Sequence, residues 1–415
     1  MTSSSLQRRL GLGDAVFIGL GSMIGAGVFA VWAPAADAAG TGLLIGLAIA
    51  AIVAFGNATS SAQLAAAHPT SGGTYAYGRA ELGPWWGFIA GWGFVVGKIA
   101  SCAAMALTFA AYAAPSGWER PVALTAVVVL TAVNAFGVTR TAGAARVIVV
   151  ISLGALAAAI TAAFSASAAP EWLTAETVWA GGGYGILQSA GLLFFAFAGY
   201  ARIATMGEEV RDPRRVIPRA IVIAFLIALA VYAVVAVAVL SALGPTAVAA
   251  STEPVAEAAA RSGWAWIGVV VRVGAAAASL GALLALIAGV SRTTFAMSRE
   301  ADLPRFLDRV HPRTHVPLRA EIAVGAVLVV LVALIDLRGA IGFSSFGVLL
   351  YYFVANVAAF RQRDDARRYP VALQIVGAIG CLVLAVTLPW QSVVGGVVVV
   401  AAGIAYRAVR LRRRA

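Results

Sequence analysis

Apolar runs of about twenty residues follow one another from Leu12 to the residue before Arg407. A helix of that length spans the hydrocarbon core of a bilayer, whereas a soluble domain has no interior large enough for so many of them. Only 12% of the 415 residues are charged, against about 25% in soluble domains, and the mean hydropathy is +0.91. The sequence therefore predicts an all-α integral membrane protein.

We predict about twelve transmembrane helices by counting apolar residues between the polar segments. The first one follows a basic patch and lacks a convincing cleavage site for a signal peptidase, so it is kept as a span. All twelve are expected to form a single polytopic domain over residues 1–415. The spans are placed at residues 12–36, 41–65, 84–113, 120–138, 147–168, 184–206, 218–243, 264–291, 320–336, 340–360, 371–389 and 391–406.

The positions of the basic residues along the chain explain the net charge of +12. Of the 30 Lys and Arg residues, 24 fall in segments on the amino-terminal side of the predicted membrane. Loops rich in Lys and Arg stay in the cytoplasm, so we expect both termini to be cytoplasmic in a protein of the inner (cytoplasmic) membrane. We therefore expect these charges to lie beside the lipid bilayer and not to bind nucleic acid. The six other cations lie on the opposite side (Arg120, Arg261, Arg338) or inside spans (Lys98, Arg202, Arg272).

Span 1 carries its glycines at its centre, in GLGSMIGAGVF from Gly19 to Phe29. One interpretation is close packing of two helices, because Gly21 and Gly25 form a GxxxG motif. The other is a break in the helix, because glycine is a poor helix former. Span 6, five spans later, has a comparable weak point at Gly199 in LLFFAFAGY. This recurrence favours discontinuous helices in spans 1 and 6.

An odd repeat of five spans must enter the membrane from the opposite face the second time. We therefore predict two inverted repeats of five spans each, over residues 1–168 and 184–360, followed by two additional spans within residues 371–406.

A broken helix at the membrane midplane leaves backbone groups that a ligand can satisfy. A zwitterion has the right chemistry, since its carboxylate can take the N–H groups around Ala26 and Gly27 at the positive start of a half-helix. Its ammonium can take carbonyl groups near Gly21 and Ser22 and in residues 194–197. The sequence thus predicts a site for a small zwitterion between spans 1 and 6.

Four motifs in order along the chain resemble the amino acid/polyamine/organocation transporter family. They are GLGSMIGAGVF, HPTSGGTYAYGRAELGPWWGFIAGW, FFAFAGYARIATMGEEVRDPRRVIPRAI and SRTTFAMSREADLP. The resemblance implies a permease that works by alternating access on amino acids or related amines, with spans 3, 8 and 10 completing the cavity. It implies that Phe195 is an aromatic gate and that the substrate lies between two facing sets of residues, Met23, Ile24, Gly25, Ala26 and Gly27, and Phe195, Ala196, Phe197, Ala198 and Gly199.

The sequence departs from the family pattern at three positions. Many proton-coupled relatives have a lysine in span 5 where VVISL puts Ser152. The acidic residue common near the end of span 2 is Gln63, and the one often found after the break of span 6 is Ala201. The family's usual route to proton coupling is therefore open to question in this chain.

Three cations fall inside predicted spans. Lys98, the only lysine of the chain, lies about midway along span 3, where it could bind a substrate carboxylate or titrate in place of the span 5 lysine. Arg202 precedes Glu208 and Glu209, so a gate ion pair competes with interfacial anchoring. Arg272 is expected in an outer vestibule or snorkelling towards the interface.

The predicted spans hold no Asp or Glu at their midplane. A cationic side chain would normally need a carboxylate there, so neutral amino acids are the favoured substrates, with apolar lining that includes Leu286. A transporter or antiporter of cationic amino acids or polyamines is the alternative. The expected coupling ion is H+, and Na+ held by Ser152 and Ser279 is the rival; no other cofactor is expected. Either a monomer or a homodimer fits the sequence.

An enzyme is the main rival from another class. His311 and His315 have the spacing of a metal pair, but Pro312 disfavours a helix and no third ligand is evident. A channel would need a continuous polar lining, which these spans do not offer. A secondary transporter is the interpretation that the sequence favours, and an enzyme is not expected.

Overall fold

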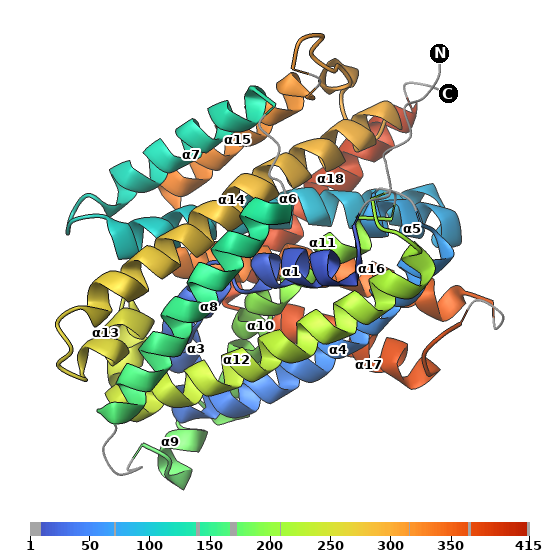
Figure 1. The fold of residues 1–415 in the computed structure, drawn as a ribbon. Coiled ribbons are helices and arrows are strands. Elements are labelled where there is room, and N and C mark those ends of the chain that lie inside the picture. The colour runs from blue at the N-terminus through green and yellow to red at the C-terminus, as the bar shows by residue number, and fades with distance from the viewer. Residues whose placement is uncertain are drawn as a thin grey trace.

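The computed structural model describes residues 10–69, 72–137, 142–166, 172–207, 209–314, 316–363 and 367–412. In these segments the chain is helical, and the only β-structure is one isolated bridge between Leu10 and Val210. Long helices lie side by side in one bundle, and the two ends of the chain lie near each other (Figure 1). The predicted all-α class is confirmed.

The first part of the chain supplies the helices of predicted spans 1 to 5. Span 1 consists of three pieces, and α5 lies between spans 2 and 3. The bounds are α1 (Leu12–Met23), α2 (Gly27–Ala30), α3 (Trp32–Ala39), η1 (Gly40–Gly42), α4 (Leu43–Ala67), α5 (Gly73–Leu82), α6 (Pro84–Ala113), α7 (Glu119–Ala135) and α8 (Ala142–Ser165).

The second part supplies the remaining seven spans. Short helices α9 and α13 lie between spans, and span 6 is divided. The bounds are α9 (Ala175–Trp179), α10 (Gly182–Phe197), η2 (Ala198–Tyr200), α11 (Ala201–Ala204), α12 (Pro213–Ala250), α13 (Pro254–Ala260), α14 (Ile267–Arg299), η3 (Arg305–Leu307), α15 (Leu318–Leu334), α16 (Leu337–Arg361), α17 (Val371–Thr387) and α18 (Trp390–Arg412).

Every predicted span coincides with a helix or a series of helices. Among the described residues, nine helical segments are long and apolar enough to cross a membrane, and α17 is a shorter apolar helix. The largest boundary error concerns α12 and α14, which run well past the ends predicted from apolarity at residues 243 and 291. Polar helix formers continue α14 to Arg299, and α12 includes a kink at Gly244, where φ is 75°, directly before Pro245.

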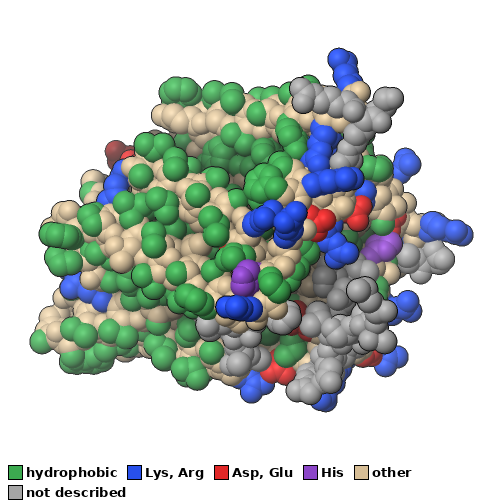
Figure 2. All heavy atoms as spheres, turned by 90° about the horizontal axis from the view of Figure 1, so that it is seen from above, with side chains coloured by type: hydrophobic (Ala, Val, Ile, Leu, Met, Phe, Trp, Pro, Cys, Tyr) green, Lys and Arg blue, Asp and Glu red, His purple; other side chains and the backbone are tan. Residues whose placement is uncertain are grey.

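Contacts between loops that are distant in the sequence occur on two opposite sides of the molecule. On the amino-terminal side, Leu10 exchanges backbone hydrogen bonds with Glu209 and Arg211 at 3.1 and 2.9 Å. On the opposite side, Asp37 pairs with Arg338 at the start of span 10. Figure 2 shows charged side chains gathered towards one end of the visible face and apolar side chains over most of the rest. This arrangement agrees with the alternation of loops that the basic residues predicted.

Spans 3 and 10 pack closely against each other through glycines in the bundle interior. A Cβ atom added to Gly97 of α6 would lie 3.0 Å from the backbone of Gly347 in α16, and one added to Gly347 would lie 2.7 Å from Gly97 Cα. Small residues allow two membrane helices to approach this closely. The contact fixes α6 and α16, the helices that carry Lys98 and Tyr352 towards the centre of the molecule.

Candidate functional site

Span 1 is broken at the predicted glycines. Helix α1 ends at Met23, the Ile24 N–H still donates to the Leu20 carbonyl at 2.6 Å, and α2 begins at Gly27. Phe29 and Ala30 both donate to the Ala26 carbonyl at 3.1 Å. Between these bonds, the N–H groups of Gly25, Ala26 and Val28 have no backbone acceptor among the described residues. The break therefore presents free donors in the interior of a membrane protein.

Span 6 is interrupted more gently than span 1. Helix α10 ends at Phe197 and passes into the 3-10 turn Ala198–Tyr200, after which α11 runs only to Ala204. The backbone of Ala198 remains near the right-handed helical region, with φ −64° and ψ −2°. Both predicted discontinuities are confirmed, but the second is a tightening of the helix and not an extended stretch.

The two discontinuities are packed directly against each other. A Cβ atom on Gly199 would lie 2.3 Å from the Ser22 carbonyl oxygen, and one on Gly27 would lie 2.8 Å from Ala196 Cα. Gly25 has the Ala282 methyl group of α14 at 2.9 Å from its added Cβ, so it also serves close packing. The two interpretations of the glycine-rich segment are therefore both correct, for different glycines.

Tyr232 of α12 bridges the two discontinuities. Its hydroxyl lies 2.6 Å from the Met23 carbonyl oxygen and 2.9 Å from that of Ala196. A phenol has one proton, so it donates to only one of these carbonyls at a time. Its ring packs edge-on against Phe197, with centroids 5.0 Å apart. Sequence reasoning missed Tyr232, because it lies in an apolar span with no local motif.

Lys98 lies at the discontinuity of span 6. Its Nζ donates to the Ala198 carbonyl at 3.2 Å, and the residue is only 6% exposed. Tyr352 of α16 donates to the same carbonyl at 3.3 Å. In the part of the chain that the structure describes, Lys98 forms no ion pair with a carboxylate. A side chain buried in this way does not snorkel to the membrane interface.

The remaining predicted residues fall into two groups. Met23, Ile24, Ala26 and the residues from Phe195 to Ala198 are buried around the two discontinuities. Leu286 is half-buried on α14 and packs against the core. Ser152 donates to the Ile148 carbonyl of its own helix at 2.8 Å, whereas the Ser279 hydroxyl is buried with no hydrogen-bond partner among the described residues.

The two arginines inside predicted spans lie on opposite sides of the molecule. Arg202 donates to the Thr205 hydroxyl at 3.3 Å and forms no ion pair with Glu209 in the described chain; Glu208 lies outside the described residues. Arg272 is bound by both carboxylate oxygens of Glu253, at 3.0 and 2.6 Å, on the side opposite the termini. The prediction of an ion pair between Arg202 and Glu208 stays a prediction.

Gln63, which stands where relatives often have an acid, connects span 2 to the loop between spans 10 and 11. Its amide nitrogen donates to Gln362 Oε1 at 2.9 Å, and its oxygen accepts from the backbone N–H groups of Arg368 and Tyr369 at 2.9 and 3.2 Å. Its amide group is thus used as a structural connector.

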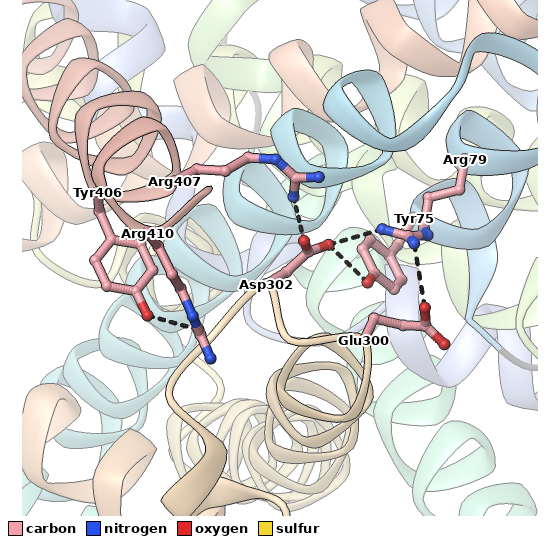
Figure 3. Close-up of polar contacts among 7 residues, drawn as sticks. All are labelled: Tyr75, Arg79, Glu300, Asp302, Tyr406, Arg407 and Arg410. Carbon is pink, nitrogen blue, oxygen red and sulfur yellow. Dashed lines mark hydrogen bonds and ion pairs between the residues drawn. The ribbon is translucent and has the colours of Figure 1, made fainter. Parts of the chain in front are cut away.

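A buried ion cluster lies on the amino-terminal side (Figure 3). Asp302, which follows α14, accepts from the Tyr75 hydroxyl at 2.9 Å and from Arg79 at 3.0 Å, and it pairs with Arg407 of α18. Arg79 also pairs with Glu300 at 3.1 Å. Burial, and then the Asp302 carboxylate, raise the pKa of Tyr75, so the phenol remains a hydrogen-bond donor. We call these residues the Asp302 cluster.

Arg407 is held by aromatic rings as well as by charge. Its guanidinium lies 5.0 Å from the Trp85 ring centroid and 4.8 Å from that of Phe88, both at the start of α6. The Asp302 cluster therefore joins α5, α6, the segment after α14 and α18. Sequence analysis quoted SREADLP as a motif but gave Asp302 no role, because its three partners come from distant segments.

Comparisons with known proteins agree with this architecture. A family model described as amino acid permease matches residues 10–409. An uncharacterized transporter of Mycobacterium tuberculosis is 58% identical over 99% of this chain and 93% of its own length. A branched-chain amino acid permease of Bacillus subtilis is 26% identical over 94% of this chain and 90% of its own. Cationic amino acid transporter 4 of Homo sapiens is 29% identical over 85% of this chain and 59% of its own.

These matches exclude the enzyme considered above and agree with the expected multi-pass membrane transporter. They also agree with the resemblance in the four motifs. With its two broken spans and a match over nearly its whole length, the chain belongs to the amino acid permease family.

Proposed function

We propose that this permease moves neutral amino acids across the inner membrane by alternating access, with substrate bound between the discontinuities of spans 1 and 6. The observation that carries the proposal is that the N–H groups of Gly25, Ala26 and Val28 lack a backbone acceptor and are buried against span 6. A carboxylate is the natural acceptor for such groups at the start of a half-helix. The substrate's ammonium would take carbonyl groups that the two discontinuities release.

The charges around this site favour a neutral side chain over a cationic one. The ammonium of Lys98 is 3.2 Å from the Ala198 carbonyl, and no carboxylate of the described residues pairs with it. A cationic side chain would therefore meet a like charge in a medium of low dielectric constant. The small residues Ala26, Ala196 and Ala198 leave room for a side chain of modest size. Similarity to a protein named as a cationic amino acid transporter keeps that substrate class as the alternative.

Proton coupling through Lys98 is the proposed source of energy. Lys98 is buried, contacts the carbonyl of a residue in the substrate site, and can change its charge as the site opens. Sodium coupling is the rival, for which the unpartnered Ser279 hydroxyl is the best candidate ligand. Ser152 is a weaker candidate because its hydroxyl donates to its own helix.

The inverted-repeat organisation and the orientation belong to the same proposal. Residues 1–168 and 184–360 would be two related halves of opposite orientation, with α17 and α18 added at the end. Segments rich in Arg on the amino-terminal side support cytoplasmic termini. The protein would act as a monomer or as a homodimer.

Counterflow in vesicles tests the proposal. Purified protein is reconstituted and loaded with one unlabelled compound, and uptake of the labelled compound is followed for leucine, alanine, glutamate, arginine and putrescine. We expect exchange of neutral amino acids, with accumulation driven by an inward pH gradient and not by sodium. Exchange of arginine or putrescine alone would overturn the substrate class, and sodium-driven accumulation would overturn the coupling ion.

A further inference from the structure

Glu321 is a buried acid that the substrate site does not use. It is the fourth residue of α15 and only 2% exposed. Its carboxyl lies beside the Ser291 hydroxyl of α14, and its Oε2 atom has no hydrogen-bond partner among the described residues. An acid buried in a membrane helix without a counter-ion is costly, so such residues are commonly functional.

The charged and titratable neighbours of Glu321 come from the helices packed against α15. Helix α14 contributes Arg292, which is exposed but within electrostatic range of the carboxyl. Helix α6 contributes Cys102, also within electrostatic range. The charges of α7 lie far from Glu321, since Arg120 donates to carbonyls at the opposite end of α15. The 3-10 helix η3 contributes Arg305, which is exposed. Glu321 forms no ion pair with any described residue.

The surroundings of Glu321 favour the neutral form of the acid. The Ser291 hydroxyl already has the Ile287 carbonyl as a partner, at 2.9 Å. It does not replace a counter-ion, and the Glu321 Oε2 atom has no hydrogen-bond partner among the described residues. A neutral carboxylic acid costs much less to bury than an unpaired carboxylate.

Glu321 and the Lys98 of the substrate site lie near the same turn of α6. Cys102, one turn after Lys98, is within electrostatic range of both Lys98 and Glu321. Lys98 is directed to the Ala198 carbonyl in span 6, whereas Glu321 lies in the interface between α15 and α14. Two buried ionisable groups thus lie near one turn of α6, Lys98 at the substrate site and Glu321 beside an exposed arginine.

We propose that Glu321 is a second proton-binding site of this permease, on the path between the substrate site and the amino-terminal side. It holds a proton in the conformation described here. When α15 separates from α14, the proton passes to water on that side, and the Arg292 guanidinium compensates the carboxylate that remains. This inference rests on the proposed proton coupling.

Infrared difference spectroscopy tests the proton site without any substrate. The protein in lipid is titrated from acid to alkaline pH, and the carbonyl band of protonated carboxylic acids is followed in the wild type, Glu321→Gln and Glu257→Gln. Glu257 is an exposed residue of α13 and provides the matched control. We expect Glu321→Gln to lose a band that persists above about pH 5, where exposed carboxylic acids are already ionised, and Glu257→Gln to keep that band. Identical titrations of the wild type and Glu321→Gln would overturn the proposal.

A transport assay tests the role of this proton in coupling. The probe is labelled L-leucine, in vesicles with and without an inward proton gradient. For one proton per substrate, a gradient of about one pH unit drives at most about tenfold accumulation, and we expect Glu321→Gln to lose all of it while counterflow continues. Full accumulation by Glu321→Gln would overturn the proposal.

Two further outcomes have assigned meanings. If Glu321→Gln also loses counterflow, Glu321→Asp is measured next. Recovery of accumulation in Glu321→Asp supports the proton site. A Glu321→Asp variant that folds but does not transport shows that Glu321 is structural and overturns the proposal. If the wild type exchanges none of the compounds in the counterflow panel, the proposed function fails. The infrared titration still decides the protonation of Glu321 in that case.

Discussion

The substrate site at the centre of the molecule and the Asp302 cluster on the amino-terminal side are assembled in opposite ways. At the centre, two backbone discontinuities meet through glycines, and side chains of Tyr232, Lys98 and Tyr352 bind only carbonyl groups. In the Asp302 cluster, carboxylates and guanidinium groups from three segments bind one another. The centre offers unused hydrogen-bonding groups to a ligand, whereas the cluster uses its groups on itself.

This difference suggests a division of labour. Free backbone donors bind a small molecule without discriminating strongly among side chains, which suits a permease for a class of amino acids. The cluster ties α18 to the start of α6 and to the end of α14, so it stabilises the arrangement of that side. Variants that affect one region and spare the other test the division.

The largest effect is expected from Gly199→Val. The added side chain would collide with the Ser22 carbonyl, because even a Cβ atom would lie 2.3 Å from that oxygen. We expect the loss of counterflow for every substrate, since the two discontinuities can no longer meet. Gly289→Val on α14 is the control, because no atom lies within 4 Å of its added Cβ. Equal transport by both variants would contradict the contact between spans 1 and 6.

Lys98→Gln should separate binding from coupling. The amide can still donate to the Ala198 carbonyl, which Lys98 approaches at 3.2 Å, but it cannot carry a proton. We expect counterflow to continue and accumulation driven by a pH gradient to be lost. Arg202→Gln serves as the control, because it also removes a cation from a span. Undiminished accumulation in Lys98→Gln would remove Lys98 from the coupling mechanism.

Asp302→Asn should destabilise the protein more than it impairs substrate binding. Removing one partner of a buried ion pair costs about 3 to 5 kcal/mol, because the other charges remain buried. Thermal unfolding of the purified protein in lipid should occur at a clearly lower temperature, with the substrate affinity of the folded protein little changed. Glu300→Gln is the control: its carboxylate is more than half exposed, and such pairs contribute about 0 to 1 kcal/mol. Equal melting temperatures for the two variants would contradict a stabilising role of the buried cluster.

The smallest effect is expected from Tyr232→Phe. The variant keeps the ring packed on Phe197 and removes the hydroxyl that lies between the Met23 and Ala196 carbonyls. A hydrogen bond contributes about 0.5 to 1.5 kcal/mol, so we expect up to about a tenfold change in the KM for exchange. Tyr112→Phe, which loses a hydroxyl bonded to the Phe29 carbonyl in α2 and to neither of the Met23 and Ala196 carbonyls, should change the KM less. A larger effect of Tyr112→Phe would contradict the bridging role of Tyr232.

Local sequence features predicted much of the fold. Apolar runs located helices at all twelve predicted positions, and glycines located the discontinuity at Gly25, because both are properties of consecutive residues. The end of α14 was misplaced because polar residues continue the helix beyond the apolar stretch, and that of α12 because the helix resumes after the kink at Gly244. The gentle form of the second discontinuity was also missed, since a glycine permits several backbone conformations.

Residues that act through long-range contacts were not found in the sequence. Tyr232 reaches its two carbonyls across 209 and 36 positions, and Asp302 collects partners from α5 and α18. Glu321 lies near the end of its span, where a charged residue is ordinarily solvated, and only packing by α14 and α6 buries it. Such environments depend on which helices become neighbours.

The most direct measurement is a structure determined with a transported amino acid bound. We predict its carboxylate within hydrogen-bond distance, about 3 Å, of the backbone N–H groups of Gly25, Ala26 and Val28. Its ammonium should lie against carbonyl groups of the same two discontinuities. An amino acid bound elsewhere, with these N–H groups still unoccupied, would contradict the proposed site.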